Sequence, residues 1–173
     1  RYETRVGNVG NPEQDPNYPK ARSTPTVDGN FIYALGSDGD LVCLEAKGGK
    51  IRWQKSLRKD FDGKPHTWAY AESPLVDGDL LVVTPGGAQA TMVALNKKTG
   101  ALIWKSAIPG GDAAGYASAI VIQAAGRKQY VQFLSKGVVG VDAKTGEFLW
   151  RYTEVVKGPA QVFTPVARDG YVY

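Results

Sequence analysis

The sequence predicts an all-β fold, a β-propeller of four-stranded antiparallel blades, with about three and a half blades in this chain. Two observations support this prediction. A strand–turn–strand pattern with a Gly four residues before a Trp occurs three times, at 42–53, 93–104 and 139–150. A second strand pair precedes each copy, and successive Trp residues are 51 and 46 positions apart. Four short strands joined by tight turns, repeating every roughly 40–50 residues, are typical of propeller blades.

In chain order, the pattern divides the sequence into a leading segment, three blades and the start of a further blade. Residues 1–22 predict an irregular loop that follows a preceding blade, because Arg1-Tyr2 repeats the Arg151-Tyr152 pair found after the last Trp. The expected blades are 23–57, 73–108 and 118–153, with the start of another at 163–173. Three blades and a fragment do not close a ring, so we expect the remaining blades to come from a longer polypeptide or from homo-oligomerisation.

Each repeat has two residues with an expected structural role. The turn needs a positive φ, which a side chain would penalise, so it holds a glycine. These glycines are Gly49, Gly100 and Gly146. The last strand carries an indole, which we expect to wedge between neighbouring blades with its N–H bonded to backbone. These tryptophans are Trp53, Trp104 and Trp150.

The repeat as a whole resembles one that is known from a protein family. A Leu-x-Ala-x-x-x-x-Gly-x-x-x-Trp pattern, preceded by a Ser/Thr-Pro-x-Val-x-Asp-Gly strand pair, is similar to the PQQ-like propeller repeat, from about Ser23 to the end. That family includes quinoprotein alcohol dehydrogenases and BamB-type outer-membrane assembly scaffolds. The resemblance implies a periplasmic or otherwise exported protein. Because the family holds enzymes and non-enzymatic scaffolds, the resemblance indicates fold more strongly than activity.

Composition argues against several classes of function. No apolar window of 18 or more residues exists, so no membrane span is expected. The net charge is +4, but the lysines recur in the turn before each Trp and alternate with acids, which favours a solvated face over a nucleic-acid partner. The chain has one cysteine, which excludes an intrachain disulfide. Cys43 shares its repeat position with Ala94 and Gly140, where we expect strands of adjacent blades to approach closely.

No metal site is expected from the sequence. His66 is the only histidine, which rules out a His-rich site. Two pairs of aspartates invite a calcium interpretation, Asp38 with Asp40 and Asp60 with Asp62. Neither pair has the ligand count of a calcium loop, so both are interpreted as turn residues.

The connections between blades predict where function lies. The first connection is the longest, with its extra residues in 58–71, and insertions in repeat proteins map to one face. Trp68 lies in this insertion and belongs to no repeat position. Aromatic and polar side chains around the mouth of the central channel would suit a ligand site. The candidates are Arg22, Trp68, Tyr70, Glu72, Tyr116 and Gln161. Alternatively, these side chains plug the channel and hold the loop down.

Three functions remain open. The sequence favours a non-catalytic scaffold that presents its loop face to a protein, a glycan or a small ligand, with no cofactor and no catalytic residue. The second is part of a quinoprotein dehydrogenase, for which the resemblance implies PQQ, calcium, an Asp base and commonly a vicinal Cys pair. One cysteine cannot supply that pair, and no Asp stands out at the channel. The third is a purely structural extracytoplasmic domain.

Overall fold

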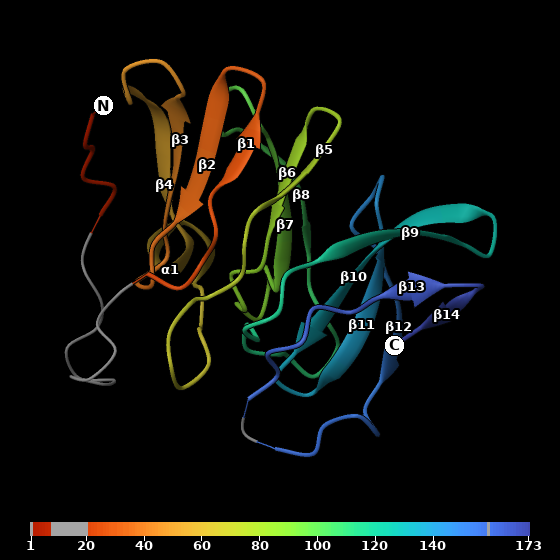
Figure 1. Cartoon of the computed structure of the whole chain (residues 1–173). Coiled ribbons are helices and arrows are strands. Elements are labelled where there is room, and N and C mark those ends of the chain that lie inside the picture. Colours follow the sequence, from red (N-terminus) through yellow and green to blue (C-terminus); the bar gives the residue numbers. More distant parts are fainter. Residues whose placement is uncertain (1, 8–20, 159) are drawn as a thin grey trace.

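The computed structural model describes residues 2–7, 21–158 and 160–173 (Figure 1). It contains three four-stranded sheets, a two-stranded sheet and one short helix. Every strand pairs antiparallel with its neighbour in the chain, so each full sheet is a simple meander. The sheets follow one another as separate blades (Figure 1). The predicted fold, a partial β-propeller, is confirmed.

The strands have the following bounds. The first sheet has β1 (Thr26–Asp28), β2 (Phe31–Leu35), β3 (Asp40–Glu45) and β4 (Ile51–Ser56). The second has β5 (Leu75–Asp77), β6 (Leu80–Val83), β7 (Met92–Asn96) and β8 (Leu102–Ser106). The third has β9 (Ile120–Ala124), β10 (Arg127–Leu134), β11 (Gly137–Asp142) and β12 (Phe148–Tyr152). The last pair is β13 (Ala167–Arg168) and β14 (Tyr171–Val172).

The inner hairpin of the third sheet is longer than the other two. The β1–β2 and β5–β6 hairpins turn at an Asp-Gly, with Gly29 and Gly78 at φ 55° and 59°. The β9–β10 hairpin turns instead at Ala125-Gly126, both with positive φ, and its pairing begins at Arg127 with Ala124. The third copy therefore departs from the repeat pattern because its hairpin is extended, and both of its strands are present.

The outer hairpin of each sheet carries the turn glycine and the tryptophan. The three turn glycines have φ values of 68°, 72° and 75°. In each sheet the pairing shifts by one residue just before the Trp: Cys43 faces Trp53, whereas Leu44 faces Ile51. Such a β-bulge increases the local twist of the strand. The repeated bulge was not predicted from the sequence.

The small residues of the repeat lie between sheets and opposite the tryptophan of their own sheet. Cys43 belongs to the apolar layer between sheets one and two, and Ala94 to the layer between sheets two and three, where adjacent blades were expected to approach. Cys43, Ala94 and Gly140 are the cross-strand partners of the three repeat tryptophans. A Cβ added to Gly140 would collide with the Trp150 indole. A bulky side chain at this position would therefore occupy the space that the indole needs.

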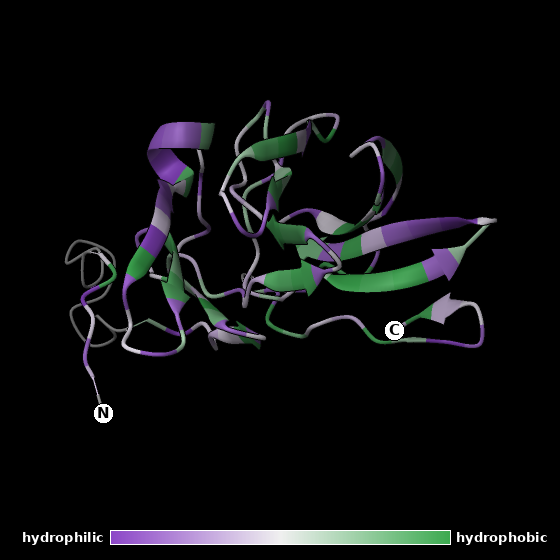
Figure 2. Cartoon of the chain, turned by 90° about the horizontal axis from the view of Figure 1, so that it is seen from above, coloured by the Kyte–Doolittle hydropathy of each residue, from purple (hydrophilic) through white to green (hydrophobic). Residues whose placement is uncertain are grey.

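Two apolar layers join the three full sheets. The first lies between sheets one and two and includes Tyr33, Leu81 and Leu95. The second lies between sheets two and three and includes Val82 and Tyr130. Successive residues of one strand, such as Leu81 and Val82, serve the two layers because side chains alternate across a sheet. Apolar strand segments run through the interior, and α1 (Leu57–Phe61) is largely hydrophilic (Figure 2).

Two of the repeat tryptophans cross from their own sheet to the next. Trp53 Nε1 donates to the Lys97 carbonyl at 3.0 Å, and its ring lies against Gly100. Trp104 Nε1 donates to the Ala143 carbonyl at 3.2 Å, and its ring lies against Gly146. Gly100 and Gly146 thus each contact the indole of the preceding sheet; we call such a glycine contact a glycine seat. A side chain at either position would collide with the ring.

The corresponding seat on the first sheet is taken by Tyr2. Its hydroxyl donates to the Ala46 carbonyl at 2.9 Å, and a Cβ on Gly49 would collide with its ring. Ala46 holds the same repeat position as Lys97 and Ala143. Tyr2 therefore occupies the place of a repeat Trp, whereas the sequence alignment matched it with Tyr152.

Trp150 departs from the pattern. We expected its N–H to bond to backbone, but Nε1 donates to the Gln129 side-chain oxygen at 2.8 Å within the same sheet.

Candidate loop-face binding site

The connections between successive sheets meet on one face of the molecule, which we call the loop face. It is formed by residues 57–74, 107–119 and 153–158 with 160–166. His66 N donates to the Ala114 carbonyl at 3.2 Å, and Tyr116 N donates to the Gln161 carbonyl at 3.0 Å. In Figure 1 this face, with α1, lies opposite the β1–β2 and β3–β4 turns. The three connections therefore form one continuous surface.

The first connection begins with a short helix where the sequence analysis expected only a turn. Ser56 caps α1 by accepting from Lys59 N at 3.3 Å, and Asp60 accepts from Ser56 N at 3.0 Å. This reciprocal arrangement is similar to a capping box, with the returning carboxylate one position later, at N4. Asp62 ends the helix in the left-handed conformation, with φ 49°. Both aspartates thus have local structural roles.

The rest of the insertion rests on a shelf formed by Pro85, Gly86 and Gly87. Lys64 N donates to the Pro85 carbonyl at 2.8 Å. A Cβ on Gly86 would collide with the Lys64 carbonyl, and one on Gly87 would collide with the Phe61 carbonyl. Only glycine allows this close backbone approach. The Pro-Gly-Gly sequence was the signal for this shelf, and the sequence analysis missed it.

The peptide group at Trp68 is held on both sides by neighbouring blades. An Arg22 guanidinium N–H donates to the Trp68 carbonyl, and Trp68 N donates to the Tyr116 hydroxyl at 3.0 Å. The Trp68 and Tyr116 rings lie 5.8 Å apart, tilted at 42°. Ala69, the next residue, has φ 70°, a strained conformation for a residue with a side chain. The structure therefore brings together Arg22, Trp68 and Tyr116.

His66 belongs to this cluster, although the sequence analysis did not include it. Its Nδ1 lies 2.8 Å from the Tyr116 hydroxyl, and the two rings meet edge to face at 5.5 Å. Burial raises the pKa of Tyr116, so this phenol stays protonated at neutral pH. The half-buried Trp68 indole donates no hydrogen bond within the described part of the chain. We call Arg22, His66, Trp68 and Tyr116 the Trp68 cluster.

Three of the six sequence candidates lie in the interior and are not displayed at the channel mouth. Tyr70 is fully buried in the first apolar layer, and its hydroxyl donates to the Pro85 carbonyl at 2.8 Å. Burial raises its pKa. Gln161 is buried, with Nε2 donating to the Gly158 carbonyl at 2.8 Å. The contacts of Tyr70 and Gln161 therefore stabilise the loops from the interior of the protein.

Glu72, the third interior candidate, links the second and third sheets. Its carboxylate accepts from Thr84 N and from Gln132 Nε2, the latter at 3.0 Å. Gln132 Nε2 also lies 3.1 Å from the Ala117 carbonyl. Only 2% of Glu72 is exposed, and burial raises its pKa to about 7. Glu72 is therefore a buried polar bridge between blades.

A chain of hydroxyl groups joins successive sheets where each innermost strand begins. Thr24 N donates to Ser73 Oγ at 3.0 Å, and Ser73 N donates to Ser118 Oγ at 2.8 Å. Ser118 N in turn donates to Thr164 Oγ1 at 3.2 Å. These residues share one repeat position, directly before Pro25, Pro74, Ala119 and Pro165. The Ser or Thr hydroxyl at this repeat position therefore accepts a backbone hydrogen bond from the preceding blade and holds the two blades together.

The described residues do not fit a quinone–calcium group. Within residues 2–7, 21–158 and 160–173, no three His, Cys, Asp or Glu side chains gather as metal ligands. Both Glu72 oxygens are already bonded within the protein. Buried Asp112 accepts from Ser135 Oγ, from Lys136 N at 3.0 Å and from Arg151 Nη2 at 3.1 Å.

Comparison with known proteins gives matches of two kinds. A family model described as outer membrane protein assembly factor BamB matches residues 7–172. The chain is 31% identical over 136 residues to a 1-butanol dehydrogenase (quinone) of Thauera butanivorans, covering 72% of this chain and 21% of that protein. It is 34% identical over 83 residues to a quinoprotein ethanol dehydrogenase of Pseudomonas aeruginosa, covering 48% of this chain and 13% of that protein.

A solved structure shares the fold. BamB from Moraxella catarrhalis aligns with a TM-score of 0.61 at 21% identity, over 88% of this chain and 42% of that one. The present chain thus spans less than half the length of each of these relatives. In the described part of the chain, no helix is long and apolar enough to cross a membrane.

Proposed function

We propose that this chain, which belongs to the BamB-like family of PQQ-repeat β-propellers, acts as a non-catalytic scaffold that binds a protein partner through the Trp68 cluster. The observation that supports the proposal is the way Trp68 is held. Arg22 and Tyr116 fix its peptide group from two neighbouring blades, while its indole N–H has no acceptor in the described residues. A rigid aromatic with an unused donor, beside an arginine, suits a binding hot spot.

The type of partner follows from the family and from the chemistry of the cluster. The family model is described as an outer membrane protein assembly factor, which favours a protein partner and a location outside the cytoplasm. Trp and Tyr supply large contact area at low entropic cost, and Arg adds hydrogen bonds. A glycan would also stack on Trp68, so the test includes one.

The dehydrogenase relatives suggest the alternative of quinone-dependent alcohol oxidation. No three possible metal ligands gather within the described residues, and the buried acids Glu72 and Asp112 are bonded within the protein. The scaffold is therefore the function that the geometry supports best.

The test is a binding measurement with purified chain labelled for fluorescence anisotropy. The probes are an unfolded outer-membrane protein, a polysaccharide, and PQQ with Ca²⁺. We expect the unfolded protein to bind, and Trp68→Ala to weaken binding about tenfold, or about 1.4 kcal/mol. Trp68→Phe should retain most of the affinity, and Ile103→Ser, at a side chain 52% exposed on β8, should bind as wild type.

Two results would contradict the proposal. Equal affinity of the Trp68→Ala variant and wild type would remove the cluster from the binding site. Quinone- and calcium-dependent oxidation of 1-butanol by the chain would instead favour the dehydrogenase alternative.

A further inference from the structure

A hollow lies between the second and third sheets, and its volume is about 430 Å³. It is bordered by the β5–β6, β9–β10 and β11–β12 turns, which lie at the end of the blades opposite the loop face. Its most buried lining residues are Tyr130 and Ala143, which are 0% and 5% exposed. The other lining residues are Asp77, Gly78, Leu80, Arg127, Lys128, Asp142 and Lys144. We call this space the Ala143 hollow.

The hollow exists because the third sheet has an alanine where the second sheet has a lysine. Ala143 N donates to the Lys128 carbonyl at 3.0 Å. Lys97 N donates to the Asp79 carbonyl in the same way, so Ala143 and Lys97 share one place in their sheets. Between sheets one and two, the Lys97 side chain fills this place with 15% of it exposed, and its ammonium lies 2.5 Å from Asp28. The Ala143 methyl fills far less of the corresponding space between sheets two and three.

The two acids of the hollow already have partners. Asp77, which has the repeat position of Asp28, accepts from Lys128 Nζ at 2.6 Å. It also accepts from the Tyr130 hydroxyl at 2.7 Å. Asp142 accepts from two backbone N–H groups of its own turn, at 2.9 and 3.0 Å. A cationic ligand would therefore have to displace groups that both carboxylates already bind.

The cations of the hollow are less completely paired than its acids. Lys144 is exposed, and its ammonium has no acidic partner in the part of the chain that the structure describes. Arg127 is half-exposed and lies 3.6 Å from Asp142 and 3.9 Å from Glu147, which are weak contacts in water. The charged lining residues are three cations, Arg127, Lys128 and Lys144, and two anions, Asp77 and Asp142. The hollow therefore favours an anionic ligand.

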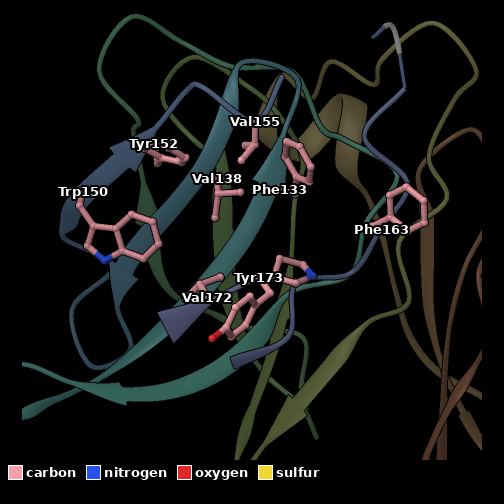
Figure 3. Close-up of a pocket in the computed structure, with 9 residues that line it drawn as sticks. Phe133, Val138, Trp150, Tyr152, Val155, Phe163, Val172 and Tyr173 are labelled. Atoms are coloured by element: carbon pink, nitrogen blue, oxygen red, sulfur yellow. The ribbon is translucent and has the colours of Figure 1, made fainter. Parts of the chain in front are cut away.

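An apolar groove elsewhere in the molecule lacks this combination of groups. It lies between the third sheet and the β13–β14 hairpin and has a volume of about 470 Å³ (Figure 3). Its lining residues, among them Phe133, Trp150 and Phe163, include no charged side chain. Polar groups at defined positions are what orient a ligand in an apolar site. The Ala143 hollow has such groups, and the groove does not.

We propose that the Ala143 hollow binds a small aromatic carboxylate, whose ring lies on Tyr130 and Ala143 and whose carboxylate accepts from Lys144 and Arg127. Small-molecule sites have volumes of roughly 300–1,000 Å³ and combine apolar walls with a few polar groups. The hollow has both properties. It lies at the other end of the blades from the Trp68 cluster, so this site is independent of the scaffold function proposed above.

The test is a titration of the chain with phenylacetate, followed by NMR at the tryptophan indole N–H groups. Trp104 reports on the hollow, because its N–H donates to the Ala143 carbonyl and its ring lies 6.0 Å from that of Tyr130. We expect the Trp104 resonance to shift with a Kd on the order of 1 mM, while Trp53 stays unchanged. Phenylethanol, which has no charge, and phenethylamine, which has the opposite charge, should each bind at least about fivefold more weakly.

Two variants with matched controls locate the ligand. Lys144→Gln removes the charge of an exposed side chain and should weaken phenylacetate binding about fivefold. Lys98→Gln should bind as wild type, because Lys98 has the same repeat position in the second sheet and is also exposed. Ala143→Met should fill the hollow and abolish the Trp104 shift. Ala46→Met, at the equivalent position of the first sheet, should leave the shift unchanged.

Several results would overturn the proposal. Phenethylamine binding as tightly as phenylacetate would show that the hollow does not select an anion. Equal affinities of the Lys144→Gln and Lys98→Gln variants would remove Lys144 from the site, and this comparison remains decisive if Ala143→Met does not fold. A response of Trp150 alone would place the ligand in the apolar groove, which Trp150 lines. Trp68→Ala should not change phenylacetate binding, so the two proposals can fail separately.

Discussion

At the scale of single residues, Trp104 connects two blades through one side chain. It is 7% exposed, donates to the Ala143 carbonyl, and packs 6.0 Å from the Tyr130 ring. Removing such an indole leaves a cavity and an unpaired carbonyl, so Trp104→Ala should lower the free energy of unfolding by about 3–5 kcal/mol. Urea denaturation measures this change.

The neighbouring residue provides the control for Trp104. Ile103 is 52% exposed on the same strand, so Ile103→Ala should change stability by no more than about 0.5 kcal/mol. Equal losses in the two variants would show that the indole is not the main contact between the blades.

Glu72 should make stability depend on pH. Burial raises its pKa in the folded protein to about 7, whereas an exposed glutamate titrates near about 4.3. Between these values the folded state holds a proton that the unfolded state releases, so this contribution to stability is complete below about pH 4 and is lost as the pH rises through about 7. The loss is on the order of 3 kcal/mol.

Glu72→Gln tests this dependence, because glutamine imitates the protonated carboxyl and does not titrate. Wild type should lose stability relative to this variant between pH 4.5 and 8, as judged by urea midpoints across roughly that range. A constant difference between the two proteins at every pH would contradict the assigned role of burial.

At the scale of elements, the hydroxyl chain from Thr24 to Thr164 holds the starts of the innermost strands together. Ser118→Ala leaves Ser73 N without its acceptor, and such a loss should cost about 1 kcal/mol. Ser118→Thr is the matched control, since threonine already has this repeat position at Thr24 and Thr164. In thermal unfolding, we expect the threonine variant to have the melting temperature of wild type and the alanine variant to have a lower one.

The elements also show what the sequence could predict. Strands, turns and turn glycines recur in every blade. Because the copies can be compared within one sequence, these features could be predicted without a structure. The features that sequence analysis missed occur once or depend on neighbours: α1, the shelf at Pro85–Gly87, and the fold-back of Trp150. The β-bulge does repeat in each sheet. It was missed because the extra residue before each Trp leaves no mark in the sequence pattern that would distinguish a bulge from regular pairing.

For the candidate site, the sequence pointed to the first connection, and the structure shows which of the predicted side chains lie on its surface. Trp68 stands out because it interrupts the repeat, and Arg22 and Tyr116 do lie against it. Tyr70 and Glu72 lie two and four residues after Trp68 but are buried, and the chain turns inward after Ala69, which has a positive φ that the sequence does not mark. His66 joins the cluster through a contact with Tyr116 across 50 positions, which no local pattern encodes.

At the scale of the whole molecule, stability is a sum of contacts between neighbouring blades. The first three blades touch one another through an apolar layer, an indole that lies on a turn glycine, and a hydroxyl that accepts a backbone hydrogen bond. Ion pairs add to the same interfaces: Lys97 to Asp28 at 2.5 Å and Lys128 to Asp77 at 2.6 Å. In repeat proteins such nearest-neighbour terms make the scaffold rigid while its loops vary. The loop face can therefore carry a binding cluster without disturbing the blades.

The tryptophans differ in role: Trp53 and Trp104 join neighbouring blades, whereas Trp68 is the residue that we propose to be displayed for binding. Hydrogen exchange of the indole N–H groups, followed by NMR, tests this most directly. We expect slow exchange for Trp53 and Trp104, whose N–H groups bond to backbone carbonyls of the next blade, and fast exchange for Trp68. Slow exchange at Trp68 together with fast exchange at Trp104 would contradict it.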